Sequence, residues 1–305
     1  MMACDEAYPA DAIDLPVASQ RKLYNALCSR FSMPYPPGLS VIDDRVDGVA
    51  LRVYRPDTAD NPPLLIYLHG GGFVVGNLDS HASICAEIAD QAGVGVIAVD
   101  YRLAPEHRFP AAFDDCWAAV AASRRLAADH RLDAARLVIA GDSAGGNLTA
   151  ATCLRARDCG GPTVRGQVLI YPGLGGDMTK GSYIQHAQAP GLPAEDIHFY
   201  HESYLGPPAH PNHANKYAVP LLETDYSRLP PAFIVAAEWD PLRDDAFDYA
   251  ARLKAAGGVA HVRHEPLLVH AFLRARHMSD PAAESFAAIT AAARSLAYDG
   301  DLPRQ

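Results

Sequence analysis

A serine flanked by closely spaced glycines constrains this chain more than any other feature. Ser143 stands in the string GDSAGGN, residues 141–147, which contains the pattern G-x-S-x-G. The apolar run before it, residues 136–140, predicts a buried strand, and residues 146–157 predict a helix. Gly141 and Gly145 suit a sharp turn in which side chains would collide with the neighbouring backbone. The sequence therefore predicts a strand-to-helix elbow that presents Ser143 as a nucleophile, with a serine in an ordinary glycine-rich turn as the alternative.

A second glycine string, HGGGF at residues 69–73, follows the strand-like run 64–68. Three consecutive glycines leave backbone N–H groups uncovered, so a ligand can approach them closely. We expect the N–H groups of Gly71 and Gly72, together with that of Ala144 after the serine, to form an oxyanion hole. A flexible turn is the alternative for this string taken alone.

A serine nucleophile needs a base to accept its proton and an acid to orient the base. Asp240 follows the apolar run 233–237 and precedes Pro241, at the expected carboxyl end of a strand. Three neighbouring acids remain alternatives that face solvent or cap the next helix: Glu238, Asp244 and Asp245.

His270 is the expected base because it lies in an apolar setting after the last predicted strand. The alternative for a histidine in an apolar run is a core residue whose ring nitrogens are hydrogen-bonded. Three other histidines lie nearby but in less suitable positions: His261, His264 and His277.

Strand-like and helix-like segments alternate along most of the chain, which predicts an α/β fold with a mostly parallel central sheet flanked by helices. The expected strands are residues 49–54, 64–68, 94–99, 137–140, 166–171, 232–237 and 259–264, and the expected helices include 19–31, 80–91, 109–128, 146–157 and 245–256. Two regions break this rhythm. Residues 1–45 are expected to form an N-terminal cap segment, and a cap-like insertion at about 177–229, with a helix at 194–204, is expected within a catalytic domain of residues 46–305.

Composition excludes several classes of protein. The 26 basic and 36 acidic residues give a net charge of -10 without a basic cluster, which argues against a nucleic-acid partner. No apolar stretch approaches the length of a membrane-spanning helix, and the early acids in the N-terminal segment do not suit a secretory signal, so a cytoplasmic protein is expected. Without C-x-x-C spacing, six cysteines are expected to be free buried thiols, with no metal site: Cys4, Cys28, Cys85, Cys116, Cys153 and Cys159.

Taken together, these motifs resemble the hormone-sensitive-lipase-like family of α/β-hydrolases, in its bacterial carboxylesterase branch. The resemblance runs from about residue 45 to the end, through HGGGF, DYRLAPEH at 100–107, GDSAGGN, Tyr171-Pro172 and DPLRD at 240–244. It implies the α/β-hydrolase fold with a helical cap, Ser143, Asp240 and His270 as the catalytic triad, and the three oxyanion donors named above. It also implies a homodimer as the expected assembly.

Two segments call for separate expectations. Arg102, Glu106 and His107 of DYRLAPEH are expected to form a polar network behind the glycine string. Asp142, next to the nucleophile, is expected to orient the site without contacting the substrate. Relatives usually carry glycine where this chain has Leu267 and Ala271, and both changes are expected to add bulk near the floor of the site.

The activity that follows is that of a serine carboxylesterase, which hydrolyses short- to medium-chain carboxylic esters through an acyl-enzyme. A small-molecule ester is the expected partner, with no cofactor, no metal and no membrane insertion. An amidase or peptidase with the same triad and a non-catalytic ligand-binding protein on this fold are the alternatives, although a binding protein of this kind would not need His270.

Overall fold

A single eight-stranded sheet forms the centre of the computed structural model, which describes residue 9, residues 11–57 and residues 60–303. The strand order is β1-β2-β4-β3-β5-β6-β7-β8. The strands are β1 (Leu39–Val46), β2 (Val49–Pro56), β3 (Pro63–Leu68), β4 (Gly95–Asp100), β5 (Asp133–Asp142), β6 (Val164–Ile170), β7 (Ala232–Trp239) and β8 (Ala260–Val269). β2 is antiparallel to both of its neighbours, and every pairing from β4 to β8 is parallel. The predicted mostly parallel sheet is confirmed.

β1 is the strand that the sequence pattern misses, since the sheet was expected to begin at residue 49. Its residues, LSVIDDRV, alternate poorly and are mostly exposed or half-buried, because β1 is an edge strand that pairs only with β2. A strand with one open edge and one solvated face has little apolar signal in its sequence.

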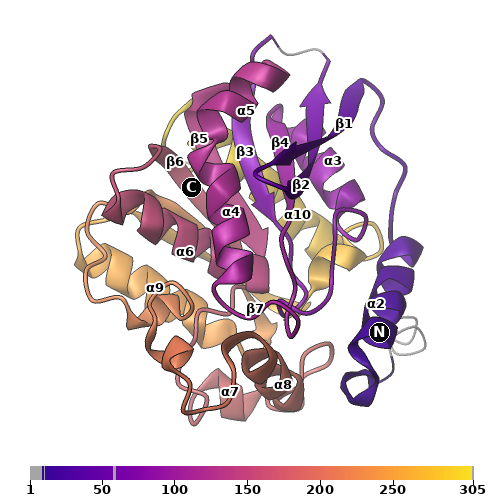
Figure 1. Ribbon diagram of the computed structural model, residues 1–305, viewed down its shortest axis with the longest axis vertical. Helices are drawn as coiled ribbons and strands as arrows, with labels where there is room; N and C mark the ends of the chain where they lie inside the picture. The colour runs from indigo at the N-terminus through magenta and orange to yellow at the C-terminus, as the bar shows by residue number, and fades with distance from the viewer. Residues whose placement is uncertain (1–8, 10, 58–59, 304–305) are drawn as a thin grey trace.

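Helices cover both faces of the sheet (Figure 1). α3 (Ala82–Ala92) and α10 (Asp280–Tyr298) pack on one face, and α4 (Ala111–Ala121), α5 (Ser123–His130), α6 (Ala144–Asp158) and α9 (Arg243–Ala255) pack on the other. The helix expected over 109–128 is therefore two helices, and α10 has no counterpart in the expected set.

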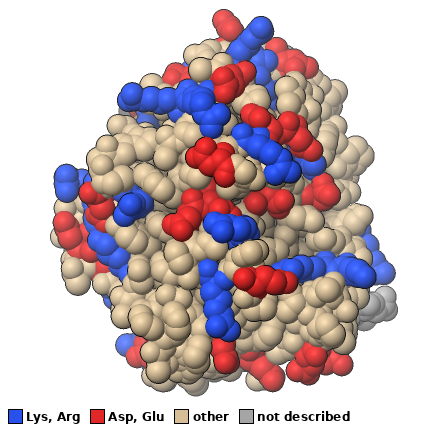
Figure 2. All heavy atoms as spheres, viewed as in Figure 1, with Lys and Arg blue, Asp and Glu red and all other residues tan. Residues whose placement is uncertain are grey.

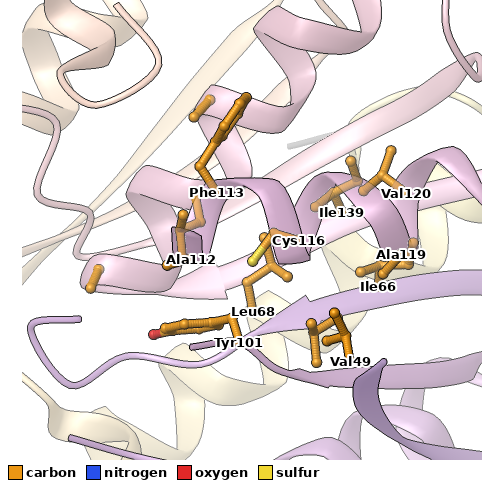
Figure 3. Packing of buried hydrophobic residues seen from close by; sticks show 14 of the residues in the cluster. Val49, Ile66, Leu68, Tyr101, Ala112, Phe113, Cys116, Ala119, Val120 and Ile139 are labelled. Atoms are coloured by element: carbon orange, nitrogen blue, oxygen red, sulfur yellow. The ribbon is translucent and has the colours of Figure 1, made fainter. Parts of the chain in front are cut away.

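Two apolar cores follow from the alternation of side chains along buried strands. In β3, Ile66 and Leu68 point into the core beneath α4, where Leu68 lies next to Cys116 (Figure 3). The intervening Tyr67 belongs to the opposite core, with α3 and α10. β3 is buried at every position, as a central parallel strand requires.

The remaining helices gather at the end of the sheet where the parallel strands finish (Figure 1). They are α2 (Val17–Arg30), α7 (Ser182–Gln185) and α8 (Ala194–Leu205). Single-turn helices η1 (Ala12–Asp14), η2 (Pro211–Ala214), η3 (Pro220–Leu222) and η4 (Phe272–Ala275) lie in the connections. The expected helices at 19–31 and 194–204 are confirmed by α2 and α8.

Among the described residues no helix is long and apolar enough to cross a membrane. Four of the six cysteines are free and buried as expected, namely Cys28, Cys85, Cys116 and Cys153. Cys159 corrects the expectation because it is exposed, just beyond the end of α6, where the chain turns back toward β6. Cys4 lies outside the described residues.

Candidate active site

The turn at Ser143 has the tight geometry that its glycines predict. β5 ends at Asp142, α6 begins at Ala144, and Ser143 between them has φ 55° and ψ -117°. A Cβ atom on Gly145 would lie 1.8 Å from the Leu68 carbonyl oxygen, and one on Gly141 would lie 2.3 Å from the Gly145 carbonyl oxygen. Side chains at these two positions would collide with backbone, as expected, so the turn holds Ser143 half-buried at the end of the strand.

A continuous hydrogen-bonded chain joins Ser143, His270 and Asp240. His270 Nε2 lies 2.9 Å from Ser143 Oγ, and His270 Nδ1 lies 2.7 Å from Asp240 Oδ2. The Leu242 N–H donates to Asp240 Oδ1 at 2.9 Å, so both carboxylate oxygens have partners although the side chain is only 1% exposed. The Tyr171 ring packs against the imidazole, with ring centroids 4.8 Å apart. The structure brings the three predicted residues together at the carboxyl ends of β5, β7 and β8.

The alternative acids lie elsewhere. Glu238 pairs with Arg243 at 2.7 Å and with His264 at 2.7 Å, on the outer side of the same segment. Asp244 accepts a hydrogen bond from the Ser182 N–H at 2.9 Å. Asp245 accepts from the N–H groups of residues 174–176 at 2.6, 3.0 and 3.3 Å, and therefore fixes the loop that follows β6.

The three alternative histidines contact other side chains. His261 stacks on Phe233, and His277 lies 2.9 Å from Glu87. Since His264 faces Glu238, His270 is the histidine that reaches Ser143.

The glycine string folds into a turn beside Ser143. Gly71 and Gly72 have φ angles of 122° and 59°, and the Gly71 carbonyl accepts from the N–H groups of Val74 and Val75 at 3.0 and 2.9 Å. Within the part of the chain that the structure describes, no acceptor is bonded to the N–H of Gly71, Gly72 or Ala144. These three donors are available for a ligand oxygen.

Asp142 anchors the glycine string from behind. Its Oδ1 accepts from the Tyr67 hydroxyl at 2.8 Å and from the Gly70 N–H at 3.0 Å, and His81 Nε2 lies 3.4 Å from Oδ2. Burial acts to raise the pKa of Asp142, but His81 and the Tyr67 hydroxyl outweigh burial and lower the pKa to about 2. Asp142 is therefore ionised at neutral pH and holds Gly70 beside the serine, in the orienting position expected of it.

His69 supports the same loop as a neutral ring. Burial, assisted by the nearby His81, lowers the pKa of His69 to about 3. The ring stacks on Tyr101 with centroids 4.2 Å apart, and the Tyr101 hydroxyl donates to the His69 carbonyl at 2.7 Å. His81 and Tyr67 were missed from the sequence, since neither belongs to a recognisable motif.

The DYRLAPEH segment forms polar contacts, but not the network that was expected. Arg102 pairs with Asp115 at 2.8 Å, and Glu106 pairs with Arg21 of α2 at 2.6 Å. Arg21 also donates to the carbonyls of Val74 and Ala104, at 2.9 and 3.0 Å. The network behind the glycine string therefore depends on an arginine from the N-terminal helix, and in the described part of the chain no hydrogen bond joins the side chains of Arg102, Glu106 and His107.

Helix α8 covers the glycine string with two tyrosines one turn apart. The Tyr204 ring stacks on Phe73 with centroids 3.7 Å apart and planes 2° from parallel. A Cβ atom on Gly72 would lie 2.4 Å from the Tyr200 ring, so this ring rests directly on the glycine backbone. The insertion that contains α8 therefore forms one wall beside the oxyanion donors.

Leu267 does not add bulk to the site, contrary to expectation. Its side chain is 73% exposed on the edge strand β8, three residues before His270. Ala271 follows His270 with φ 59°, a left-handed conformation in which glycine is the unstrained residue.

Across the described ranges, no group of three or more His, Cys, Asp or Glu side chains is arranged to hold a metal ion. Figure 2 shows basic and acidic side chains interspersed on the face it displays. That face presents no basic field of the kind that binds a phosphate backbone.

Comparison with known proteins assigns the chain to a family. Residues 65–274 match the family model described as alpha/beta hydrolase fold. Esterase LipI of Mycobacterium tuberculosis is 40% identical over 257 residues, covering 79% of this chain and 77% of that protein. Ethyl acetate hydrolase of Pseudomonas putida is 38% identical over 79% of this chain and 77% of that protein.

A solved structure agrees with these relatives. The carboxylesterase EstE1, cloned from a metagenomic library, superposes with a TM-score of 0.85 at 33% identity, covering 93% of this chain and 99% of that chain. The chain belongs to the α/β-hydrolase family, in the hormone-sensitive-lipase-like branch that its motifs resemble. It is a carboxylic ester hydrolase by class, since its relatives share that activity at about 40% identity over most of their length.

Proposed function

We propose that the chain is a serine carboxylesterase that hydrolyses short- to medium-chain esters through an acyl-enzyme. The observation that carries this proposal is the hydrogen-bonded chain from Ser143 Oγ through His270 to Asp240, at 2.9 and 2.7 Å. It lies beside three N–H donors that have no acceptor among the described residues. Acyl transfer requires a nucleophile, an oriented base and an oxyanion site that lie close to one another.

In this mechanism His270 Nε2 removes the hydroxyl proton as Ser143 Oγ attacks the ester carbonyl. Asp240 keeps the other ring nitrogen protonated, so Nε2 is free to accept. The N–H groups of Gly71, Gly72 and Ala144 receive the developing oxyanion, and each such donor is worth about 3 to 4 kcal/mol in transition-state stabilisation. The alcohol leaves with the proton held by His270, and a water activated by His270 then releases the acid.

Acyl chains of roughly two to eight carbons would fill a pocket of ordinary small-molecule size. The position of Tyr200 against Gly72 supports this limit, because its ring takes up space next to the oxyanion donors. A serine amidase or peptidase would use the same residues, and a ligand-binding protein would retain only the pocket.

The test is hydrolysis of p-nitrophenyl esters from acetate to palmitate by the wild type and by Ser143→Ala, with matched amides in parallel. We expect activity on the short esters, little on the amides, and none in the variant, which should bind ester without turnover. Faster hydrolysis of emulsified long-chain triglyceride would overturn the chain-length proposal. Full activity of Ser143→Ala would overturn the nucleophile, and the absence of wild-type activity on every ester would favour the amidase or the binding protein.

We also propose the expected division into an N-terminal cap segment of residues 1–45 and a catalytic domain of residues 46–305 with its insertion at about 177–229, in a cytoplasmic homodimer. The free edge of the sheet supports the dimer, since β8 ends the strand order and exposes Leu267 by 73%. Light scattering of the purified protein tests the dimer, and cell fractionation tests the compartment.

A further inference from the structure

The loop that follows His270 is anchored by a buried arginine. Arg276 is 3% exposed, and its Nε donates to Glu87 Oε2 at 3.0 Å while Nη2 donates to Oε1 of the same carboxylate. Nη2 also donates to Ser83 Oγ at 2.9 Å, and Nη1 donates to the Leu273 carbonyl at 3.1 Å. The guanidinium thus joins its own loop to two successive turns of α3.

The start of the same helix contacts the other half of the site. His81, immediately before α3, places Nε2 3.4 Å from Asp142 Oδ2. Asp142 precedes Ser143 and binds the Gly70 N–H at 3.0 Å. α3 lies behind the sheet next to α10 (Figure 1). Through His81 at its start it contacts Asp142, and through Ser83 and Glu87 it contacts Arg276 of the histidine loop.

We propose that α3 sets the position of His270 relative to Ser143, and that Arg276 and Glu87 are positioning residues for the reaction. A bidentate guanidinium–carboxylate pair fixes both distance and angle. Such a buried pair adds little net stability compared with apolar residues of the same size, so we assign it the role of orienting the loop that carries His270. A catalytic group displaced by about 1 Å loses on the order of 100-fold in rate, which makes the anchoring of this loop consequential. The inference rests on the proposed role of His270.

The test compares Arg276→Met with Arg157→Met, which removes the arginine of a second buried arginine–glutamate pair. The side chains of Arg276 and Glu87 are 2% and 7% exposed, and those of Arg157 and Glu223 are both 5% exposed. Each glutamate keeps another basic partner at 2.9 Å, His277 for Glu87 and Lys216 for Glu223. Arg157 also pairs with Asp158 at 2.7 Å and lies at the far end of α6 from Ser143, so its substitution tests the loss of a buried arginine far from the site.

We measure kcat and KM on p-nitrophenyl butyrate together with the thermal midpoint of each variant. Arg276→Met should lower kcat at least about tenfold with KM changed less than about twofold, because a misplaced base affects the transition state and not substrate binding. Arg157→Met should lower the midpoint by a similar amount and leave kcat within about twofold of the wild type. Equal effects of the two substitutions on kcat, or an unchanged kcat in Arg276→Met, would overturn the inference.

Two further variants keep the proposal testable if Arg276→Met fails to fold. Ser83→Ala removes one hydrogen bond from Arg276 without unpairing a charge, and should lower kcat by about two- to fivefold, the worth of one modest hydrogen bond, at constant KM. An unchanged kcat in Ser83→Ala would then count against the inference. His270→Ala separates the two claims, since an active His270→Ala enzyme would refute the triad itself, whereas an inactive one leaves the anchoring of the loop as the only question.

Discussion

Replacing Asp240 by asparagine should abolish most of the activity and leave the fold intact. Both oxygens of the carboxylate have a partner: Oδ1 accepts from the Leu242 N–H at 2.9 Å, and Oδ2 lies 2.7 Å from His270 Nδ1. Asparagine has nearly the same shape but only one acceptor oxygen. If that oxygen faces the Leu242 N–H, the amide NH₂ faces Nδ1 and favours the tautomer with the proton on Nε2, which then cannot accept the serine proton.

We expect kcat to fall roughly 10⁴-fold, or about 5 kcal/mol in activation free energy, as for the same loss of tautomer control in other serine triads. The assay is p-nitrophenyl butyrate hydrolysis at saturating substrate, with the thermal midpoint measured on the same sample. Glu238→Gln is the matched control, because Glu238 lies two residues earlier and pairs with Arg243 and His264 instead of His270. A kcat for Asp240→Asn within about tenfold of the wild type would show that His270 is oriented without this carboxylate.

Three further substitutions test strain and buried charge. Ala271→Gly should raise the free energy of unfolding by about 0.5 to 1 kcal/mol, because the relief of the left-handed conformation at φ 59° exceeds the entropy that glycine adds to the unfolded chain. Urea denaturation measures this change, and a loss of stability would contradict the strain at Ala271. The pKa of Asp142 falls from 3.8 to about 2 on folding, so its ionised form contributes about 2 kcal/mol of stability that is present above pH 4 and lost as the pH drops through 2. Asp142→Asn should flatten the stability profile between pH 5 and 2 by that amount, and an unchanged slope would argue against it. Burial raises the pKa of Asp245 to about 7 despite its backbone N–H donors, so the native state binds the extra proton and the wild type loses stability as the pH rises from 4 to 7. Asp245→Asn should therefore gain stability relative to the wild type between pH 5 and 8 in urea titrations, and the opposite trend would refute the raised pKa.

The sheet was predictable where strands are buried on both faces. β3 and the inner part of β5 are continuous apolar runs, and these were located correctly from residues 64–68 and 137–140. β1 was not, because its polar edge residues have neither a continuous apolar run nor a clean alternation. The break at Ala122 that separates α4 from α5 was also missed, since apolar periodicity continues across it.

The residues of the candidate site differ in how far the sequence reveals them. Ser143, Asp240 and His270 follow strand ends, and parallel strands bring those ends to one edge of the sheet. The supporting contacts depend on side chains from segments far apart in the chain. Arg276 and Glu87 are separated by 189 positions in the sequence, and Arg21 and Glu106 by 85 positions, so no local sequence pattern predicts either pair.

The two halves of the site are fixed by different physical means. At Gly145 and Gly72, an added Cβ would lie 1.8 Å from backbone and 2.4 Å from the Tyr200 ring, so close packing against the glycines holds the nucleophile turn and the oxyanion donors. His270 has no such constraint, because it follows an edge strand with one neighbour and precedes a residue in a left-handed conformation. A histidine on such a loop needs side-chain anchors to stay within 2.9 Å of Ser143 Oγ. The Arg276 guanidinium, bound to Glu87 and Ser83 of α3, supplies an anchor for this loop where backbone packing ends.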